Sequence, residues 1–126
     1  MLQFSDNVIG TVTVIRVAGS PNEDSLPTFS PLLNKVRDCL TPAAQFLVLN
    51  LGNNPELNSE DLLIELIRAN VMAREAGARL RLCEVPQGLL YQMQDCKVIH
   101  MFKIDPTESR SLAQFANNGQ TRRLRA

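Results

Sequence analysis

The pattern of apolar and polar residues predicts an alternation of strands and helices. Residues 46–51 form a short, almost continuous apolar run, which is typical of a strand buried on both faces of a sheet. Turn-forming residues follow at 52–56, and apolar residues then recur at helical spacing as far as Ala76. We expect Gly77 to end this helix and residues 79–83 to form the next strand. A strand, a crossover helix and a second strand make parallel neighbours in a sheet.

The residues before this unit predict two strands and a helix. The first strand is expected near residues 2–4 and the second, rich in β-branched residues, across residues 11–17. The short connection between them predicts an antiparallel pair. The helix that follows carries four leucines and valines on one face: Leu32, Leu33, Val36 and Leu40.

The start of that helix has two alternatives, because two prolines cannot both occupy the first helical position. Ser30 caps a helix that begins at Pro31, or the helix begins near Pro27 and is distorted at Pro31.

The C-terminal part predicts three more elements. These are a short helix at residues 89–94, a short strand at 102–104 and a closing helix that Asp105 and Pro106 open, with the proline at its first position. Three of its residues are expected to face inward: Leu112, Ala113 and Phe115. The resulting order, ββαβαβαβα, predicts an α/β fold with a mixed, mostly parallel sheet and helices packed on it.

Composition indicates one ordinary globular domain. The chain has 126 residues, of which 44% are hydrophobic and 21% charged, and no stretch has the apolar length of a membrane span. The first residues lack the basic and apolar regions of a signal peptide, so we expect a cytoplasmic protein. The three cysteines show no CxxC spacing, which predicts reduced thiols and neither a zinc site nor a disulfide framework.

The charges are spread unevenly although the net charge is zero. Residues 117–126 contain three arginines and no acid, so residues 1–116 carry a net charge of −3. We expect residues 1–116 to form the domain and 117–126 to be a basic flexible tail. The mildly acidic body argues against nucleic acid as a partner.

Candidate chemistry centres on the start of the helix after residue 57. Asn58 and Ser59 are N-cap residues, and Glu60 and Asp61 place negative charge in the first turn, where the helix dipole favours it. A cap alone accounts for a serine here, since it contributes about 1 kcal/mol. His100, the only histidine, has no partner in a catalytic spacing, so we expect no enzymatic activity, metal or cofactor.

Four segments together resemble a known family in their order and spacing. They are Val14-Ile15-Arg16-Val17-Ala18-Gly19, Val48-Leu49-Asn50-Leu51, Ala76-Gly77-Ala78-Arg79-Leu80-Arg81-Leu82 with Val85-Pro86 after it, and Met101-Phe102-Lys103-Ile104-Asp105. They resemble the STAS domain, the fold of bacterial anti-sigma factor antagonists and of the cytoplasmic tails of sulfate transporters. The resemblance covers the chain from about Gly10 to Phe115.

The functional motif of that family is a hydrophobic residue followed by Asp-Ser-Ser-Gly-Leu, whose first serine a partner kinase phosphorylates. The resemblance places Ser59 on the phosphorylated position. Asn58 replaces the aspartate, Glu60 the second serine and Asp61 the glycine. Where the family commonly has Gly-x-Leu-Asp in its first loop, this chain has Gly19-Ser20-Pro21-Asn22.

The resemblance therefore implies a non-enzymatic regulatory domain of bacterial signalling and transcription control. Such a domain docks a partner protein, an anti-sigma factor or serine kinase, through the loops before its first two helices. The phosphorylation candidate is Ser59, and the implied partner-binding residues are Asn22, Glu23, Asp24, Asn54, Asn58, Ser59, Glu60 and Asp61. We expect a monomer or a weak homodimer.

Two alternatives stay open at this point. One is a STAS scaffold that has lost the phospho-switch and binds constitutively or self-associates. The other is a sensor for a small ligand or nucleotide, bound in the crevice at the strand ends.

Overall fold

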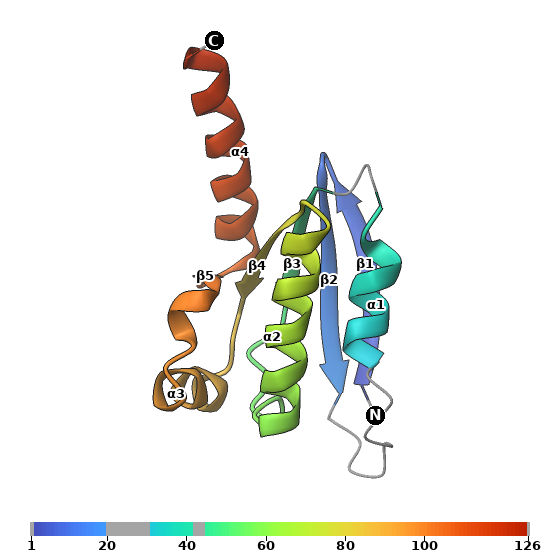
Figure 1. Ribbon diagram of the computed structural model, residues 1–126, viewed down its shortest axis with the longest axis vertical. Coiled ribbons are helices and arrows are strands. Elements are labelled where there is room, and N and C mark those ends of the chain that lie inside the picture. The colour runs from blue at the N-terminus through green and yellow to red at the C-terminus, as the bar shows by residue number, and fades with distance from the viewer. Residues whose placement is uncertain (1, 20–30, 42–44, 126) are drawn as a thin grey trace.

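The structure, a computed structural model, describes residues 2–19, 31–41 and 45–125, and only the backbone of residues 117–125. These residues form five strands, four α-helices and one short 3-10 helix (Figure 1). In chain order the elements are β1 (Leu2–Ile9), β2 (Val12–Gly19), α1 (Pro31–Cys39), β3 (Phe46–Asn50), α2 (Glu60–Glu75), β4 (Arg79–Cys83), α3 (Gln87–Asp95), the 3-10 helix η1 (Ile99–Met101), β5 (Lys103–Asp105) and α4 (Glu108–Arg125).

The strands form one mixed sheet in the order β1-β2-β3-β4-β5. β1 pairs with β2 antiparallel, and the three other pairings are parallel. β3 lies in the middle, where Val48 stands opposite Val14 of β2 and Arg81 of β4. The predicted α/β class, the mostly parallel sheet and the central place of residues 46–51 are therefore confirmed.

The first hairpin is longer than the sequence predicts. β1 extends to Ile9, beyond the predicted residues 2–4, and the chain reverses at Gly10, whose φ is +63°. β1 is an edge strand on which polar side chains such as Ser5 and Asn7 are exposed. An edge strand tolerates polar residues because water solvates them.

One face of the sheet is covered by α1, α2 and α3. α1 is described from Pro31 and buries Leu32, Leu33 and Val36. The two alternatives for its start differ at residues 27–30, which lie outside the described residues. α2 buries five apolar residues against the sheet: Leu62, Leu63, Leu66, Ala69 and Ala73. On the strands, alternate residues such as Ile15 and Leu49 point into this core.

α2 begins and ends where local signals predict. The Ser59 hydroxyl accepts a hydrogen bond from the backbone N–H of Leu62 at 3.1 Å and caps the helix. Gly77, with φ +79°, ends it in a Schellman motif, in which the amides of Gly77 and Ala78 donate to the carbonyls of Arg74 and Ala73.

The other face of the sheet is covered by α4. Phe115 is buried there among a small set of strand residues: Val12, Val14, Val48 and Cys83. The prediction that Ala113 faces inward is wrong, because Ala113 is exposed while Leu112 is half-buried. α4 runs on to Arg125 and extends past the edge of the sheet (Figure 1), so the predicted boundary at residue 117 falls within this helix.

The predicted opening of the last helix is also wrong. Asp105 ends β5, and α4 begins at Glu108, two residues after Pro106. The hydroxyl of Thr107 accepts a hydrogen bond from the backbone N–H of Arg110 at 3.2 Å, so Thr107 caps the helix and Pro106 lies before it. Within the part of the chain that the structure describes, no helix is both long and apolar enough to cross a membrane.

Candidate functional site

The candidate site lies where the parallel strands end and the loop to α2 begins. The Asn50 side-chain oxygen accepts a hydrogen bond from the backbone N–H of Gly52 at 2.8 Å, which turns the chain sharply after β3. Gly52 and Asn53 both have positive φ, +63° and +51°. The N–H of Asn53 donates to the carbonyl of Glu84 at 2.7 Å, so the turn is fixed to the end of β4.

Asn54 ties the same loop to the end of β2. Its side-chain amide donates to the carbonyl of Gly19 at 2.6 Å, and its side-chain oxygen accepts from the N–H of Glu56 at 3.1 Å. Leu57 then points into the core, fully buried. Asn54, which was expected as a partner-binding residue, is half-buried. Its side chain holds the loop in place through these two hydrogen bonds.

Ser59 begins α2 at the surface of the molecule. Its side chain is half-buried, since the hydroxyl is turned toward the first helical turn. Glu60 and Asp61 occupy that turn, and both are exposed. The structure thus brings together the predicted residues from Asn54 to Asp61 along one loop and helix start.

Asn58 joins this surface to α3. Its side chain is exposed, and its backbone carbonyl accepts a hydrogen bond from the side-chain amide of Gln92. A Cβ atom added at Gly88 would lie 3.4 Å from the Cβ of Asn58, so α3 packs closely on the loop. The remaining three predicted residues, Asn22, Glu23 and Asp24, lie outside the described residues.

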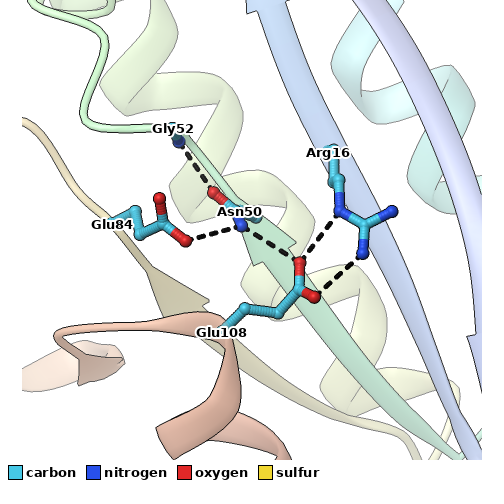
Figure 2. A network of polar contacts seen from close by, with 5 residues as sticks. All are labelled: Arg16, Asn50, Gly52, Glu84 and Glu108. Atoms are coloured by element: carbon cyan, nitrogen blue, oxygen red, sulfur yellow. Dashed lines mark hydrogen bonds and ion pairs between the residues drawn. The ribbon is translucent and has the colours of Figure 1, made fainter.

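A network of polar side chains lies behind this loop, on the sheet face that α4 covers (Figure 2). The guanidinium of Arg16 binds both carboxylate oxygens of Glu108, at 3.0 Å and 2.9 Å. Arg16 stands on β2 and Glu108 in the first turn of α4, so the pair joins this helix to the sheet. The exposed position of Arg16 limits the contribution of this ion pair to stability.

Asn50 occupies the centre of the network. Its side-chain amide donates to Glu84 at 2.8 Å and to Glu108 at 3.0 Å, while its oxygen accepts from Gly52. Both the nitrogen and the oxygen of the Asn50 side chain are therefore hydrogen-bonded, and two carboxylates contact this one neutral side chain (Figure 2). This arrangement ties the ends of β2, β3 and β4 to the first turn of α4.

A second polar cluster fixes α4 next to β5. The guanidinium of Arg81 binds the carboxylate of Asp105 through Nε at 2.6 Å and Nη2 at 3.0 Å. The hydroxyl of Ser111 donates to the same carboxylate at 2.6 Å. Asp105 and Ser111 are both buried, so this cluster is shielded from water.

These contacts shift the pKa values of the acids. The two hydrogen bonds from Arg16 hold the pKa of Glu108 below its ordinary value, although partial burial opposes this. Burial by itself raises the pKa of Asp105, but the bonds from Arg81 and Ser111 outweigh it and the net shift is downward. Both acids are therefore ionised at neutral pH.

Cys83 is fully buried on this face of the sheet. Burial, followed by the nearby carboxylates of Glu84 and Glu108, raises the pKa of its thiol to about 12. A thiol that stays protonated is neither a nucleophile nor a metal ligand. His100 lies exposed in η1, apart from both polar clusters.

An open hollow of about 390 Å³ accompanies the site at the carboxyl ends of the strands. It is lined by Asn53, Val85, Leu90, Ile104, Asp105 and Pro106. Crevices at this edge of α/β sheets commonly receive ligands. Among the described residues, no group of three or more histidines, cysteines and acids could hold a metal ion.

The two polar clusters were not predicted from the sequence. Arg16 and Asn50 each interrupt an apolar strand, and this signal could have marked them, because a polar residue in a buried strand needs a partner. Their partner Glu108 lies 92 and 58 positions away in the chain, and periodicity carries no information over such separations.

A scan against models of known protein families finds no match, and a search of curated proteins finds no similar protein either.

Proposed function

We propose that the chain is a regulatory protein-binding domain of the STAS type, which docks a partner protein through the loop before α2 and is switched by phosphorylation of Ser59. One observation carries the proposal. Ser59 stands at the surface, at the N-cap of a helix that follows the central strand, on a loop tied to both neighbouring strands. The order of elements and the mostly parallel sheet agree with what the resemblance implies.

The rigidity of the loop favours recognition by a protein. Asn53 is bonded to the end of β4 and Asn54 to the end of β2, so the surface is formed before a partner arrives. A preorganised surface loses little conformational entropy on binding. The proposed partner is an anti-sigma factor or serine kinase.

Charge indicates the chemistry of that partner surface. Glu56, Glu60 and Asp61 are exposed around Ser59, so the complementary surface would be basic. A phosphate on Ser59 would add nearly two negative charges there. It would also meet the free backbone N–H groups at the start of α2, which offset the repulsion from Glu60 and Asp61. The fold should therefore change little, and the switch would act on partner binding.

Phosphorylation can be tested in lysate of the source organism with labelled ATP. We expect label on the unmodified protein and none on Ser59→Ala. Ser109→Ala is the matched control, because Ser109 is also an exposed serine in a first helical turn, here of α4, and its loss should leave the label unchanged. Label that is absent, or equal in Ser59→Ala, would overturn the switch and favour a STAS scaffold that binds constitutively.

Docking is tested by charge reversal once affinity purification and mass spectrometry have identified a partner. Glu60→Lys and Asp61→Lys should each weaken binding several-fold and lower the melting temperature only slightly, since both side chains are exposed and only the helix dipole opposes the new charge. Asp38→Lys on α1 is the control, because Asp38 is exposed on another helix. Equal affinity of all three variants would show that this surface does not bind the partner.

A further inference from the structure

A second hollow lies at the opposite end of α2, on the edge of the sheet next to β5. β5 pairs with β4 only from Arg81 to Cys83, so the described strands leave the outer edge of β4 uncovered at Arg79 and Leu80. The resulting cleft has a volume of about 320 Å³ and lies between the C-terminal turns of α2, the start of β4 and Phe115 of α4. In Figure 1 the C-terminal end of α2 and the start of β4 lie at the same end of the sheet, and α4 rises beyond that end.

Basic side chains from three elements line this cleft. Arg74 comes from the last turn of α2, Arg79 and Arg81 from β4, and Lys103 from the first position of β5. No acidic residue is among the described residues that line it. The rest of α4, residues 117–125, contains three more arginines and no acid, so it supplies no neutralising charge.

Three of the four cations have no carboxylate partner within the described part of the chain. Only Arg81 forms an ion pair, with Asp105. Arg74, Arg79 and Lys103 form none, and Arg79 and Lys103 are exposed. Like charges held close together repel one another, so this concentration of positive charge favours an anion in the cleft.

Arg81 is held in a fixed position at the base of the cleft. Asp105 occupies its Nε and Nη2, and its guanidinium carbon lies 5.8 Å from the centre of the Phe115 ring. Asn70 of α2 closes a further side, because its amide donates to the carbonyl of Met101 at 3.0 Å. The walls of the cleft are thus set by contacts within the protein.

The remaining lining of the cleft is apolar. Leu80, Met101 and Phe115 contribute to it beside the cations. A volume of about 320 Å³ is close to the lower limit of ligand pockets, which suits a small molecule rather than a folded partner. We propose that this cleft binds a small organic phosphate, with the phosphate held by Arg74, Arg79 and Lys103 and the apolar part against Phe115 and Leu80.

This inference does not depend on the proposed function. Ser59 and its loop lie at the N-terminal end of α2, and the cationic cleft lies at the C-terminal end. A domain could bind an organic phosphate here whether or not a kinase modifies Ser59.

The test is a titration of the isotope-labelled protein with inorganic phosphate and with phenyl phosphate, followed by NMR. We expect shifts confined to the backbone amides near Arg74, Arg79 and Lys103, and tighter binding of phenyl phosphate because its ring contacts the apolar wall. Arg79→Gln and Lys103→Gln should each weaken binding roughly tenfold, the loss of one charged hydrogen bond. Both residues are exposed, so the fold should persist.

Arg37→Gln is the matched control, since Arg37 is an exposed arginine on α1. An unchanged affinity for this variant would support a built site. The proposal is overturned if phenyl phosphate causes no shifts at the cleft, or if Arg37→Gln weakens binding as much as Arg79→Gln, which would indicate attraction by overall charge. Equal affinity for the two phosphates would overturn the role of the apolar wall.

Discussion

The sheet face that carries α1, α2 and α3 differs from the face that carries α4 in what its side chains contact. On the first face, leucines and valines from strands and helices pack in one large core, with Leu49 at its centre and fully buried. On the second, a small apolar cluster around Phe115 is flanked by the Arg16–Glu108 and Arg81–Asp105 pairs.

The difference indicates a division of tasks. Apolar burial has no fixed direction and is proportional to the area removed from water, so the first face supplies most of the stability. Hydrogen-bonded ion pairs require defined geometry, so the second face sets where α4 lies and how the strand ends are arranged. The two proposed sites, the Ser59 loop and the cationic cleft, lie at the two ends of α2.

The largest effect is expected from a charge in the first face. Leu49→Asp places a carboxylate with no partner in the core, and we expect a loss of more than about 4 kcal/mol in the free energy of unfolding, enough to unfold the domain. Circular dichroism and urea titration measure this. Val8→Asp is the control, since Val8 is 65% exposed on the edge strand β1 and should lose little stability. A cooperatively folded Leu49→Asp variant would contradict the central place of β3.

A smaller effect is expected from breaking the buried cluster of the second face. Asp105→Asn leaves Arg81 without its counter-charge, and we expect a loss of about 2–4 kcal/mol in the free energy of unfolding. Replacing Arg81 with Met in the same chain removes the unpaired charge, so the double variant should regain part of the loss. A double-mutant cycle with no coupling energy would show that the pair does not stabilise the fold.

The same cluster predicts a dependence on pH. The folded-state pKa of Asp105 lies below its ordinary 3.8 and that of Glu108 below its ordinary 4.5. Acids with a lowered pKa stabilise the fold fully above the unfolded pKa, and this contribution is lost as the pH falls through the folded pKa. We therefore expect unfolding free energy to decrease below about pH 4.5.

Urea titrations over a series of acidic buffers measure this loss. The unfolding free energy of the Asp105→Asn variant should decrease less steeply than that of the unmodified protein over the same pH range, because the variant lacks one of the titrating groups. Parallel curves for the two proteins would show that Asp105 does not contribute to the acid response.

The smallest effect concerns the cap of α2. Ser59→Ala removes the acceptor for the backbone N–H of Leu62, and we expect a loss of about 1 kcal/mol, seen as a lower urea midpoint with unchanged cooperativity. Ser59→Asp should restore most of this stability, since aspartate also caps helices. A loss in Ser59→Asp as large as in Ser59→Ala would show that the cap does not account for the stability of this turn.

The order of strands and helices could be predicted because it depends on local patterns. The apolar run of β3, the helical spacing of α2 and the glycine after it each act within a few residues, and each matches the structure. The prediction was wrong where local signals competed. Pro106 suggested a helix start, but Asp105 belongs to β5. It is held there by Arg81, which lies 24 positions earlier in the chain, and by Ser111, which lies 6 positions later.

The candidate site shows the same limit. Ser59 could be placed at the start of α2, since a cap is a local feature of sequence. Asn54 was expected to contact a partner, and only the structure shows that its side-chain amide also donates to the carbonyl of Gly19, 35 positions away.

By itself, the sequence determined the elements of this protein, their order and the ends of α2, because periodicity and capping depend on neighbouring residues. The tertiary structure alone decided that Arg16, Asn50 and Glu108 meet on one face, and that Arg74, Arg79 and Lys103 line one cleft. These groups come from separate strands and helices. Their meeting depends on strand order and on the short length of β5, and both are set by packing across the whole sheet.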